Sequence, residues 1–156
     1  MAETRSFQLL DSRVQRWIWK QGWTSLLEIQ ENTIPFVLEG DRDIIVSAPT
    51  GGGKTEAVFL PIISKMLSHP IGFGYYVLYI SPLKALINDQ TRRLTDLCNE
   101  IGVGVTSWHG DIPGAKKNQS FKEPSGILII TPESLESVLM HRREGLVRAF
   151  SNLSYI

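Results

Sequence analysis

The residues most able to do chemistry lie in one short run, residues 48–55, with the sequence Ala-Pro-Thr-Gly-Gly-Gly-Lys-Thr. Three consecutive glycines let the backbone turn successive N–H groups toward one anion, because no Cβ atom holds a phosphate away. Lys54 can then reach the β- and γ-phosphates of a nucleotide, and the hydroxyl of Thr55 can bind Mg²⁺. The strict pattern begins with Gly, whereas this run begins with Ala48. The run predicts a phosphate-binding loop of the relaxed form.

The elements on either side of the loop give it the context that this motif requires. An apolar run at residues 43–47 predicts a strand buried on both faces, and residues 54–67 follow with a helical pattern. The start of that helix would add the positive end of its dipole to the loop. The alternative is a Gly-rich turn that ends in Lys and Thr by chance.

The rest of the chain alternates between buried strands and helices. Further strands are expected at residues 75–81, 103–107 and 126–131, and further helices at 11–21, 26–38, 83–101 and 132–141. This alternation predicts an α/β fold, a three-layer parallel sheet with helices on both faces. Ligands bind such sheets at the carboxyl ends of the strands, so chemistry is expected just after Ser47, Ser81, Ser107 and Thr131. We expect residues 1–40 to be an N-terminal helical segment and 41–156 to be the main domain.

Composition excludes several other classes of protein. The 156 residues are 42% hydrophobic and 21% charged, which is typical of a globular domain and not of a disordered tail or coiled coil. Sixteen basic residues balance sixteen acidic ones, so overall charge does not hold this chain on nucleic acid, although a local groove could. The single Cys98 cannot form an internal disulfide, and no signal peptide or membrane span is recognisable. We expect a soluble, cytoplasmic protein with no membrane partner.

Four groups of residues, in the right order, resemble motifs of the superfamily 2 helicases. The likeness is greatest to the large helicase-related branch, with the DEAD-box and Ski2-like enzymes as relatives, and it covers the chain from Trp17 onward. Residues 48–57 are similar to motif I, in which an initial Ala is normal. Residues 81–86 with 89–90 are similar to motif Ia, residues 108–111 to the short Gly motif that follows it, and residues 131–135 to motif Ib.

The resemblance implies a RecA-like P-loop domain that uses ATP and Mg²⁺. Gln30 resembles the glutamine that recognises adenine in this superfamily, although Leu27 stands where a Thr is usual. The implied ATP-binding residues are Gln30, Thr50, Gly51, Gly52, Gly53, Lys54, Thr55 and Glu56. Lys54 and Thr55 would carry the catalytic role, with Thr55 as the Mg²⁺ ligand, while Glu56 matches the pattern without a defined role.

The implied nucleic-acid contacts are Ser81, Pro82, Lys84, Gly110, Thr131 and Pro132. Small residues and free N–H groups at strand ends can hold successive phosphates without reading bases. Lys84 stands where the DEAD-box pattern has an Arg, and it would contact phosphate without a bidentate fork. The alternative is that Ser81 and Thr131 are helix N-caps, each followed by Pro at the first helical position, and both interpretations can hold together.

Several other residues could take part in binding or catalysis, but we expect structural or solvent-exposed positions for them. Trp17, Trp19 and Trp23 are expected in a core, with Trp23 as the candidate for adenine stacking. His109 is expected to be structural. Lys116, Lys117 and Lys122 are expected in a solvated loop, with phosphate contact as the lesser alternative. Exposed charges are expected at Arg142, Arg143 and Arg148.

These features favour the N-terminal motor domain of an ATP-dependent helicase or translocase. The alternatives are another P-loop enzyme, either a kinase or a GTPase, and a scaffold module that binds without hydrolysis. A kinase lid and a guanine-reading motif are not recognisable in the sequence. The resemblance implies DNA or RNA as partner, with DNA favoured, and a second RecA-like domain in the parent chain.

The 156 residues by themselves are expected to bind nucleotide weakly or not at all, and not to hydrolyse ATP or unwind a duplex. Hydrolysis needs a carboxylate that completes the Mg²⁺ shell and a group that orients water. The resemblance implies that the acidic motif II directly follows a strand that begins at Tyr155 and Ile156, and that the arginine finger comes from the second domain. A phosphate-release assay tests this expectation. Robust turnover that disappears in Lys54→Ala would contradict it.

Overall fold

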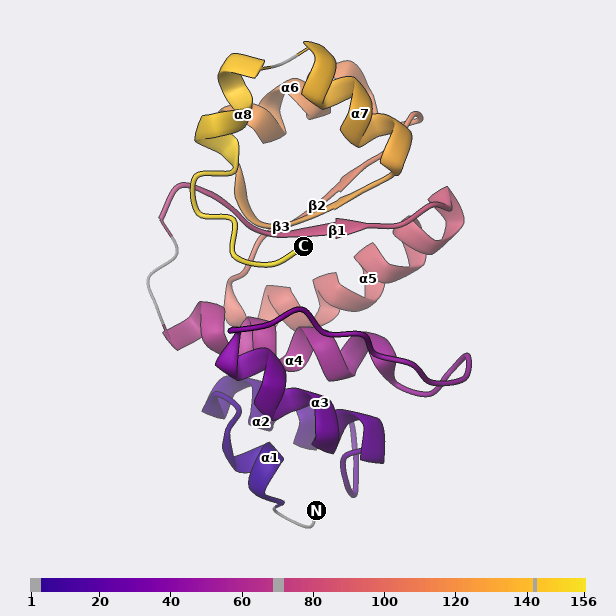
Figure 1. The fold of residues 1–156 in the computed structure, drawn as a ribbon, viewed down its shortest axis with the longest axis vertical. Helices are drawn as coiled ribbons and strands as arrows, with labels where there is room; N and C mark the ends of the chain where they lie inside the picture. Colours follow the sequence, from indigo (N-terminus) through magenta and orange to yellow (C-terminus); the bar gives the residue numbers. More distant parts are fainter. Residues whose placement is uncertain (1–3, 69–71, 142) are drawn as a thin grey trace. The chain divides into compact units, whose positions relative to one another are not determined.

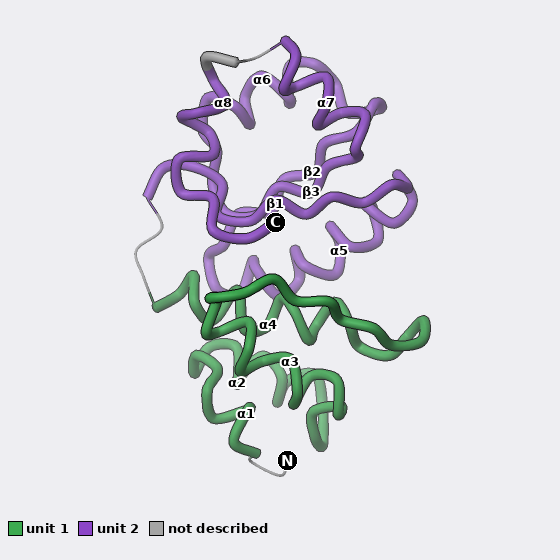
Figure 2. Tube along the Cα trace, viewed as in Figure 1, with its two compact units in different colours: residues 1–70 green, residues 71–156 purple. Residues whose placement is uncertain are grey.

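The computed structural model describes residues 4–68, 72–141 and 143–156 (Figure 1). The chain divides into two compact units, residues 1–70 and residues 71–156 (Figure 2). The phosphate loop belongs to the first unit, and the segments similar to motifs Ia and Ib belong to the second. Each unit has its own architecture.

The described part of the first unit is helical. Its helices are α1 (Arg5–Gln8), α2 (Ser12–Lys20), α3 (Glu28–Glu39) and α4 (Lys54–Ser68). Of the two N-cap candidates in the sequence, Asp11 and Ser12, it is Asp11 that caps α2, because its carboxylate accepts a hydrogen bond from the N–H of Arg13 at 2.9 Å. Gly40 ends α3 in the left-handed conformation at φ 66°. The expected helices over 11–21, 26–38 and 54–67 are therefore confirmed to within two residues.

Helix α4 is the central element of the first unit. Helix α3 packs along it, and α2 also contacts it. Its residues Leu60 and Ile63 are fully buried, as are Ile18 of α2 and Ile34 of α3. The hydroxyl of Ser64 in α4 accepts a hydrogen bond from the N–H of Asp11 at 3.0 Å, which ties the start of α2 to α4. This packing fixes the helix whose first turn carries Lys54 and Thr55.

The strand predicted at residues 43–47 is absent from the structure. Residues 43–49 have no regular secondary structure, and the side chain of Ile45 is 97% exposed. A strand needs a neighbour to pair its N–H and C=O groups. The first unit has no strand among its described residues, so no neighbour exists there. The apolar pattern of residues 43–47 is typical of a buried strand, but a pattern within one segment cannot show whether a neighbouring strand is present to pair with it.

The second unit is built on a parallel sheet with helices on both faces, which confirms the predicted fold class. Its strands, in the spatial order β1-β3-β2, are β1 (Gly74–Ile80), β2 (Val105–Trp108) and β3 (Ser125–Ile130). Its helices are α5 (Lys84–Ile101), α6 (Gly114–Lys122), α7 (Pro132–His141) and α8 (Arg143–Ala149). Helix α5 covers one face of the sheet, and α6, α7 and α8 cover the other (Figure 1).

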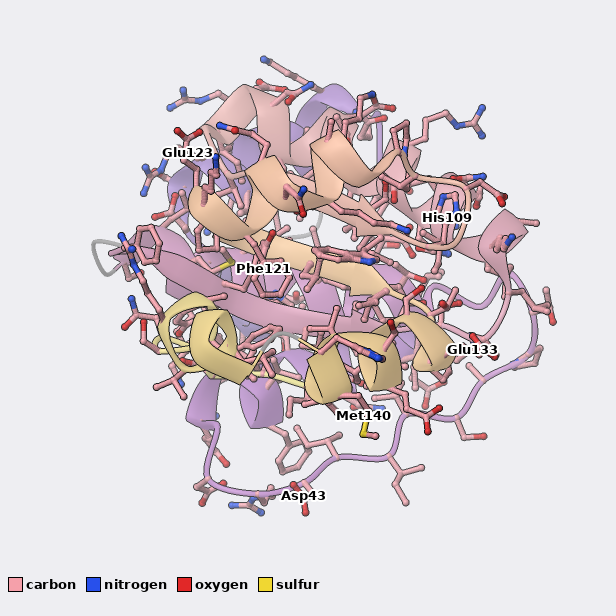
Figure 3. All side chains as sticks on the ribbon, turned by 90° about the horizontal axis from the view of Figure 1, so that it is seen from above. Asp43, His109, Phe121, Glu123, Glu133 and Met140 are labelled. Atoms are coloured by element: carbon pink, nitrogen blue, oxygen red, sulfur yellow. The ribbon has the colours of Figure 1, made fainter. Side chains whose placement is uncertain are left out.

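The central strand β3 is the most deeply buried element of the second unit. Its residues Ile127, Leu128, Ile129 and Ile130 have no exposed surface, as expected for a strand covered on both faces. On one face, Leu128 and Ile130 join a cluster that includes Trp108. The ring of Phe121 points from α6 toward the sheet and meets Trp108 edge-on, with the ring centroids 4.9 Å apart (Figure 3).

The helical pattern of residues 83–101 predicts an apolar face that includes Leu83 and Leu86, but helix α5 buries a narrower face. Ile87, Leu94 and Cys98 are buried, but Leu83 and Leu86 are exposed. Leu83 is the N-cap residue and precedes the helix, so it does not share the helical periodicity. Burial raises the pKa of the Cys98 thiol to about 12, so the thiol stays protonated.

Two further segments refine the predictions. Residues 114–122 form helix α6 where a solvated loop was expected, because Phe121 anchors the segment to the sheet. The expected start of a strand near the C-terminus is present as a single parallel bridge between Tyr155 and Val77. The N–H of Leu78 donates to the carbonyl of Tyr155 at 2.9 Å. None of the described helices combines the length and the hydropathy of a membrane span.

Two glycines with the same backbone conformation are predicted to differ in their tolerance of Ala. Gly102 (φ 75°) has open space around its missing Cβ, whereas a Cβ at Gly126 (φ 72°) would lie 2.2 Å from the carbonyl oxygen of Gly104. Gly102→Ala should cost roughly 1 kcal/mol of unfolding free energy for the left-handed backbone alone. Gly126→Ala should cost about 2 kcal/mol more, because β2 and β3 must separate locally. Urea unfolding measures both losses, and equal losses would contradict the close approach.

Candidate functional site

The predicted phosphate loop has a backbone that only glycine can adopt without strain. Gly51 and Gly53 lie in the left-handed region, with φ 79° and 77°. Between them, a Cβ at Gly52 would lie 2.9 Å from the carbonyl oxygen of Pro49, which also accepts the Gly52 N–H at 2.9 Å. Alternation of left-handed residues with ordinary ones turns neighbouring N–H groups to one side, which is how a backbone binds anions. The loop therefore has a physical reason for each of its three glycines.

Lys54 lies over this loop and does not extend into solvent. Its ammonium group donates to the carbonyl oxygens of Ala48 at 2.6 Å and Pro49 at 2.8 Å. Phosphate oxygens are charged and accept stronger hydrogen bonds than neutral carbonyls, so a phosphate can replace them. Thr55 and Glu56 lie partly buried in the first turn of α4. These donors suit a triphosphate, and Mg²⁺ commonly takes few protein ligands beside phosphate oxygens.

Gln30, the predicted adenine-reading residue, lies directly beside the loop. It is 2% exposed, and its Oε1 accepts the N–H of Leu27 at 2.9 Å, which caps the start of α3. A Cβ at Gly53 would lie 2.9 Å from the Nε2 atom of Gln30 and 2.8 Å from the Cδ1 atom of Leu27. The structure thus brings Gln30 and the loop together, and it adds a capping role that the sequence did not indicate.

The three tryptophans of the first unit lie in different environments. Trp17 and Trp23 are half-buried and meet edge-on, with centroids 5.9 Å apart. Trp19 is 50% exposed and contacts Phe7, so its predicted core position is wrong. Position 19 follows the buried Ile18 and faces away from the apolar stripe of α2. The edge-on contact with Trp17 orients the ring of Trp23, the candidate for adenine stacking.

A second candidate site is a cleft of about 650 Å³ in the second unit. Four of the six predicted nucleic-acid residues line it, namely Pro82, Lys84, Gly110 and Thr131. They follow β1, β2 and β3, so the carboxyl ends of three parallel strands meet there, as predicted. Ser81 and Pro132 precede and follow lining residues without lining the cleft themselves. The other lining residues come mainly from α6 and α7: Trp108, Lys117, Glu133, Ser134, Ser137, Val138 and His141.

Lys84, which lines this cleft, forms an exposed ion pair with Asp111. Its Nζ atom donates to Oδ1 of Asp111 at 2.8 Å. A Cβ at Gly110 would lie 3.4 Å from that Nζ atom, so the glycine leaves room for the lysine side chain. The hydrogen bond and the charge of Lys84 hold the pKa of the Asp111 carboxyl below its ordinary value, and the charges of His109 and Lys117 add to the effect.

His109 is buried and lies on the segment that follows β2 (Figure 3). Its Nε2 atom lies 3.2 Å from Oδ1 of Asn88 in α5. Its Nδ1 atom has no hydrogen-bond partner among the described residues and lies 3.8 Å from Oδ2 of Asp111. These contacts hold the segment between β2 and α6 against α5, as expected for a structural histidine.

The two candidate helix caps have different outcomes. Thr131 caps α7, because its hydroxyl oxygen accepts the N–H of Ser134 at 3.3 Å, and Pro132 is the first residue of the helix. Ser81 does not cap α5, which begins three residues later at Lys84. The N–H of Ser81 instead donates to the carbonyl of Ile130 at 3.0 Å and extends the pairing of β1 with β3.

The predictions missed that Lys117 and His141 line the cleft. Lys117 precedes Phe121 by four residues, so both lie on one face of α6. This spacing is the signal that could have revealed it, since Phe121 faces the sheet. Arg148 stacks on Phe73, with its guanidinium carbon 4.4 Å from the ring centroid. Arg142 lies outside the described residues.

Comparison with known proteins finds relatives over most of the chain. The family model described as DEAD/DEAH box helicase matches residues 27–156. The ATP-dependent helicase Lhr-Core of Sulfolobus acidocaldarius is 36% identical over 140 residues, which cover 81% of this chain and 16% of that protein. The ATP-dependent helicase YprA of Bacillus subtilis is 29% identical over 158 residues, which cover 99% of this chain and 20% of that protein.

A solved structure shares the fold of these residues. The helicase Lhr of Mycobacterium smegmatis bound to ssDNA and AMP-PNP superposes with a TM-score of 0.76 at 29% identity, over 93% of this chain and 20% of that one. The chain therefore spans a fifth or less of the length of these relatives. Since the matching region contains the phosphate loop and every strand of the sheet, the chain belongs to the DEAD/DEAH box helicase family.

Proposed function

We propose that this chain is the N-terminal ATP-binding motor domain of a nucleic-acid helicase or translocase. The observation that carries the proposal is the cleft, which gathers Pro82, Lys84, Gly110 and Thr131 at the carboxyl ends of three parallel strands. Three separate segments of the chain, after β1, β2 and β3, supply these residues. Their convergence in a family of ATP-dependent helicases supports one shared ligand, the sugar-phosphate backbone of a strand.

The first unit would bind ATP with groups that it already positions. The N–H groups of residues 50–55 would hold the phosphates, and Lys54 would leave the carbonyls of Ala48 and Pro49 for the β- and γ-phosphates. The Thr55 hydroxyl would hold Mg²⁺, with Glu56 in the same helical turn. Gln30 would read adenine through its amide. ATP supplies the phosphoanhydride bond whose cleavage drives the cycle.

The second unit would hold a strand by its backbone. Lys84 supplies the positive charge, and the small residues Gly110 and Thr131 would let phosphates come close to the backbone, with Ser81 and Pro132 next to lining residues. A second RecA-like domain in the parent chain would close on the nucleotide and shift the grip on the strand.

DNA is favoured over RNA as the substrate in this proposal. The related Lhr of Mycobacterium smegmatis was solved with ssDNA, which supports the choice. Contacts to phosphates alone do not read a 2′-hydroxyl, so a direct comparison of the two nucleic acids must decide. A cytoplasmic location fits the single buried Cys98, which has no partner cysteine in the chain.

The proposal is tested by measuring ATP hydrolysis by the full-length parent protein. Single strands of DNA and RNA of equal sequence are added separately, and Lys54→Ala serves as the inactive control. Single strands should raise turnover, and Lys54→Ala should lower kcat at least about 100-fold, because a donor to the transferred phosphate is lost. If neither nucleic acid changes the rate of ATP hydrolysis, the motor function is contradicted, and Thr131 is a helix cap only.

Two substitutions of Gln30 should separate its capping role from adenine recognition. Gln30→Glu keeps an oxygen that can accept the Leu27 N–H, and a carboxylate is favoured in the first turn of α3, but the amide N–H donor is lost. Gln30→Ala loses both functions. We expect Gln30→Ala to cost about 1 kcal/mol of stability through the lost cap, whereas Gln30→Glu keeps the cap and pays instead for a carboxylate at a position that is 2% exposed.

Both variants should reduce the preference for ATP over GTP about tenfold, since one base-specific hydrogen bond is lost. The ratio of kcat/KM for the two nucleotides cancels the effect of the added charge on phosphate binding. If Gln30→Glu retained the wild-type ratio, Gln30 would be a capping residue only.

A further inference from the structure

Lys117 occupies a defined place in the cleft, although it was expected in a solvated loop. It lies in the first half of α6, one helical turn before Phe121. Phe121 fixes that helix by its edge-on contact with Trp108, and Trp108 itself lines the cleft. Lys117 is therefore held beside the cleft by core packing, unlike Lys116, which is exposed on the same helix and does not line it.

Asp111 follows the cleft-lining Gly110 and pairs with Lys84, while Lys117 lines the same cleft. Its Oδ1 atom lies 2.8 Å from the Nζ atom of Lys84, and the positive charge of Lys117 also acts on its carboxyl. Gly110, directly before it, has no side chain to separate the groups. One carboxylate is thus paired with one of the two lysines that line a cleft continuing to Thr131 and Ser134.

We propose that Lys117 acts with Lys84 to bind one phosphate of a nucleic-acid strand in the cleft that both lysines line, at the place beside Lys84 that the Asp111 carboxylate now holds. This inference rests on the proposed function of the cleft. Strand binding exchanges one anion for another: the phosphodiester takes the lysines, and Asp111 turns out to solvent. The exchange is easy because both partners are exposed, Lys84 at 52% and Asp111 at 69%, and exposed ion pairs contribute little to stability.

A phosphodiester suits this place better than a free phosphate ion does. The cleft extends from the lysines to the first turn of α7, so it has room for more than one phosphate of a continuous strand. Thr131 and Ser134 at that end are mutually hydrogen-bonded and uncharged, and Glu133 between them is acidic. The positive charge is therefore concentrated at the Asp111 end, where one phosphate would be held most tightly.

Anisotropy of a labelled single-stranded oligothymidylate, measured with the native protein without nucleotide over a series of salt concentrations, tests the inference. Lys117→Ala and Lys84→Ala should each weaken binding about 3- to 10-fold and reduce the salt slope by about 0.7. Lys116→Ala removes the same charge from the same helix and should weaken binding less than about 2-fold, because charges outside the contact are screened.

Asp111→Asn gives the opposite sign, which a merely structural role would not produce. It should tighten binding about 3-fold, since the resident competitor for the lysines is neutralised. The gain should vanish in the Lys84→Ala/Lys117→Ala background. Asp96→Asn is the matched control, since Asp96 is exposed on α5 twelve residues beyond Lys84, about 18 Å along the helix.

The outcomes separate this inference from the proposed function. If wild type binds and Lys84→Ala weakens it, while Lys117→Ala equals Lys116→Ala or Asp111→Asn fails to tighten binding, only the two-lysine site is overturned. If neither the wild type nor any variant binds the strand, the nucleic-acid function of the cleft is overturned as well. All substituted residues are at least partly exposed, and thermal unfolding confirms that each variant is folded.

Discussion

Parallel pairing around β3 is the constraint on which the second unit depends. Because β3 pairs with β1 on one side and β2 on the other, all three strands point the same way and end at one edge of the sheet. Lys84, Gly110 and Thr131 lie far apart in the sequence, yet each follows one of these strands. Burial of the whole of residues 127–130 on both faces makes this register costly to change, since a slip would expose apolar side chains. The geometry of the cleft is therefore a by-product of core packing.

The phosphate loop of the first unit depends on a different constraint, the conformational freedom of three glycines. Left-handed φ values at Gly51 and Gly53 and the close approach of Gly52 to Pro49 define its shape before any ligand arrives. Lys54 completes it by binding the carbonyls of Ala48 and Pro49. Gln30 joins the loop to α3, because the side chain that caps this helix also packs against Gly53. The side chain of Gln30 thus takes part both in capping α3 and in packing against the phosphate loop.

Much of this arrangement could be predicted from residue types and spacing. The N-cap at Asp11, the cap at Thr131 and the end of α3 at Gly40 follow from local hydrogen bonding, which depends on a few neighbouring residues. The parallel sheet follows from buried strands that alternate with helices. Residues 43–47 could not be predicted in the same way, since strand formation depends on a partner elsewhere. Helix α6 was missed because Phe121 is its one large apolar side chain, and a single anchor produces no periodicity. Lys117 was missed with it.

Trp108 connects the core of the second unit with its cleft, and it is the only tryptophan after residue 23. Its ring lies edge-on to Phe121 of α6, while its own residue ends β2 and lines the cleft. A displacement of α6 that changed the spacing of Lys117 and Lys84 would also change the surroundings of this indole. With Trp17, Trp19 and Trp23 replaced by Phe, the emission of Trp108 would report on the second unit alone. The protein therefore carries an intrinsic optical probe at the wall of the cleft, with no label attached.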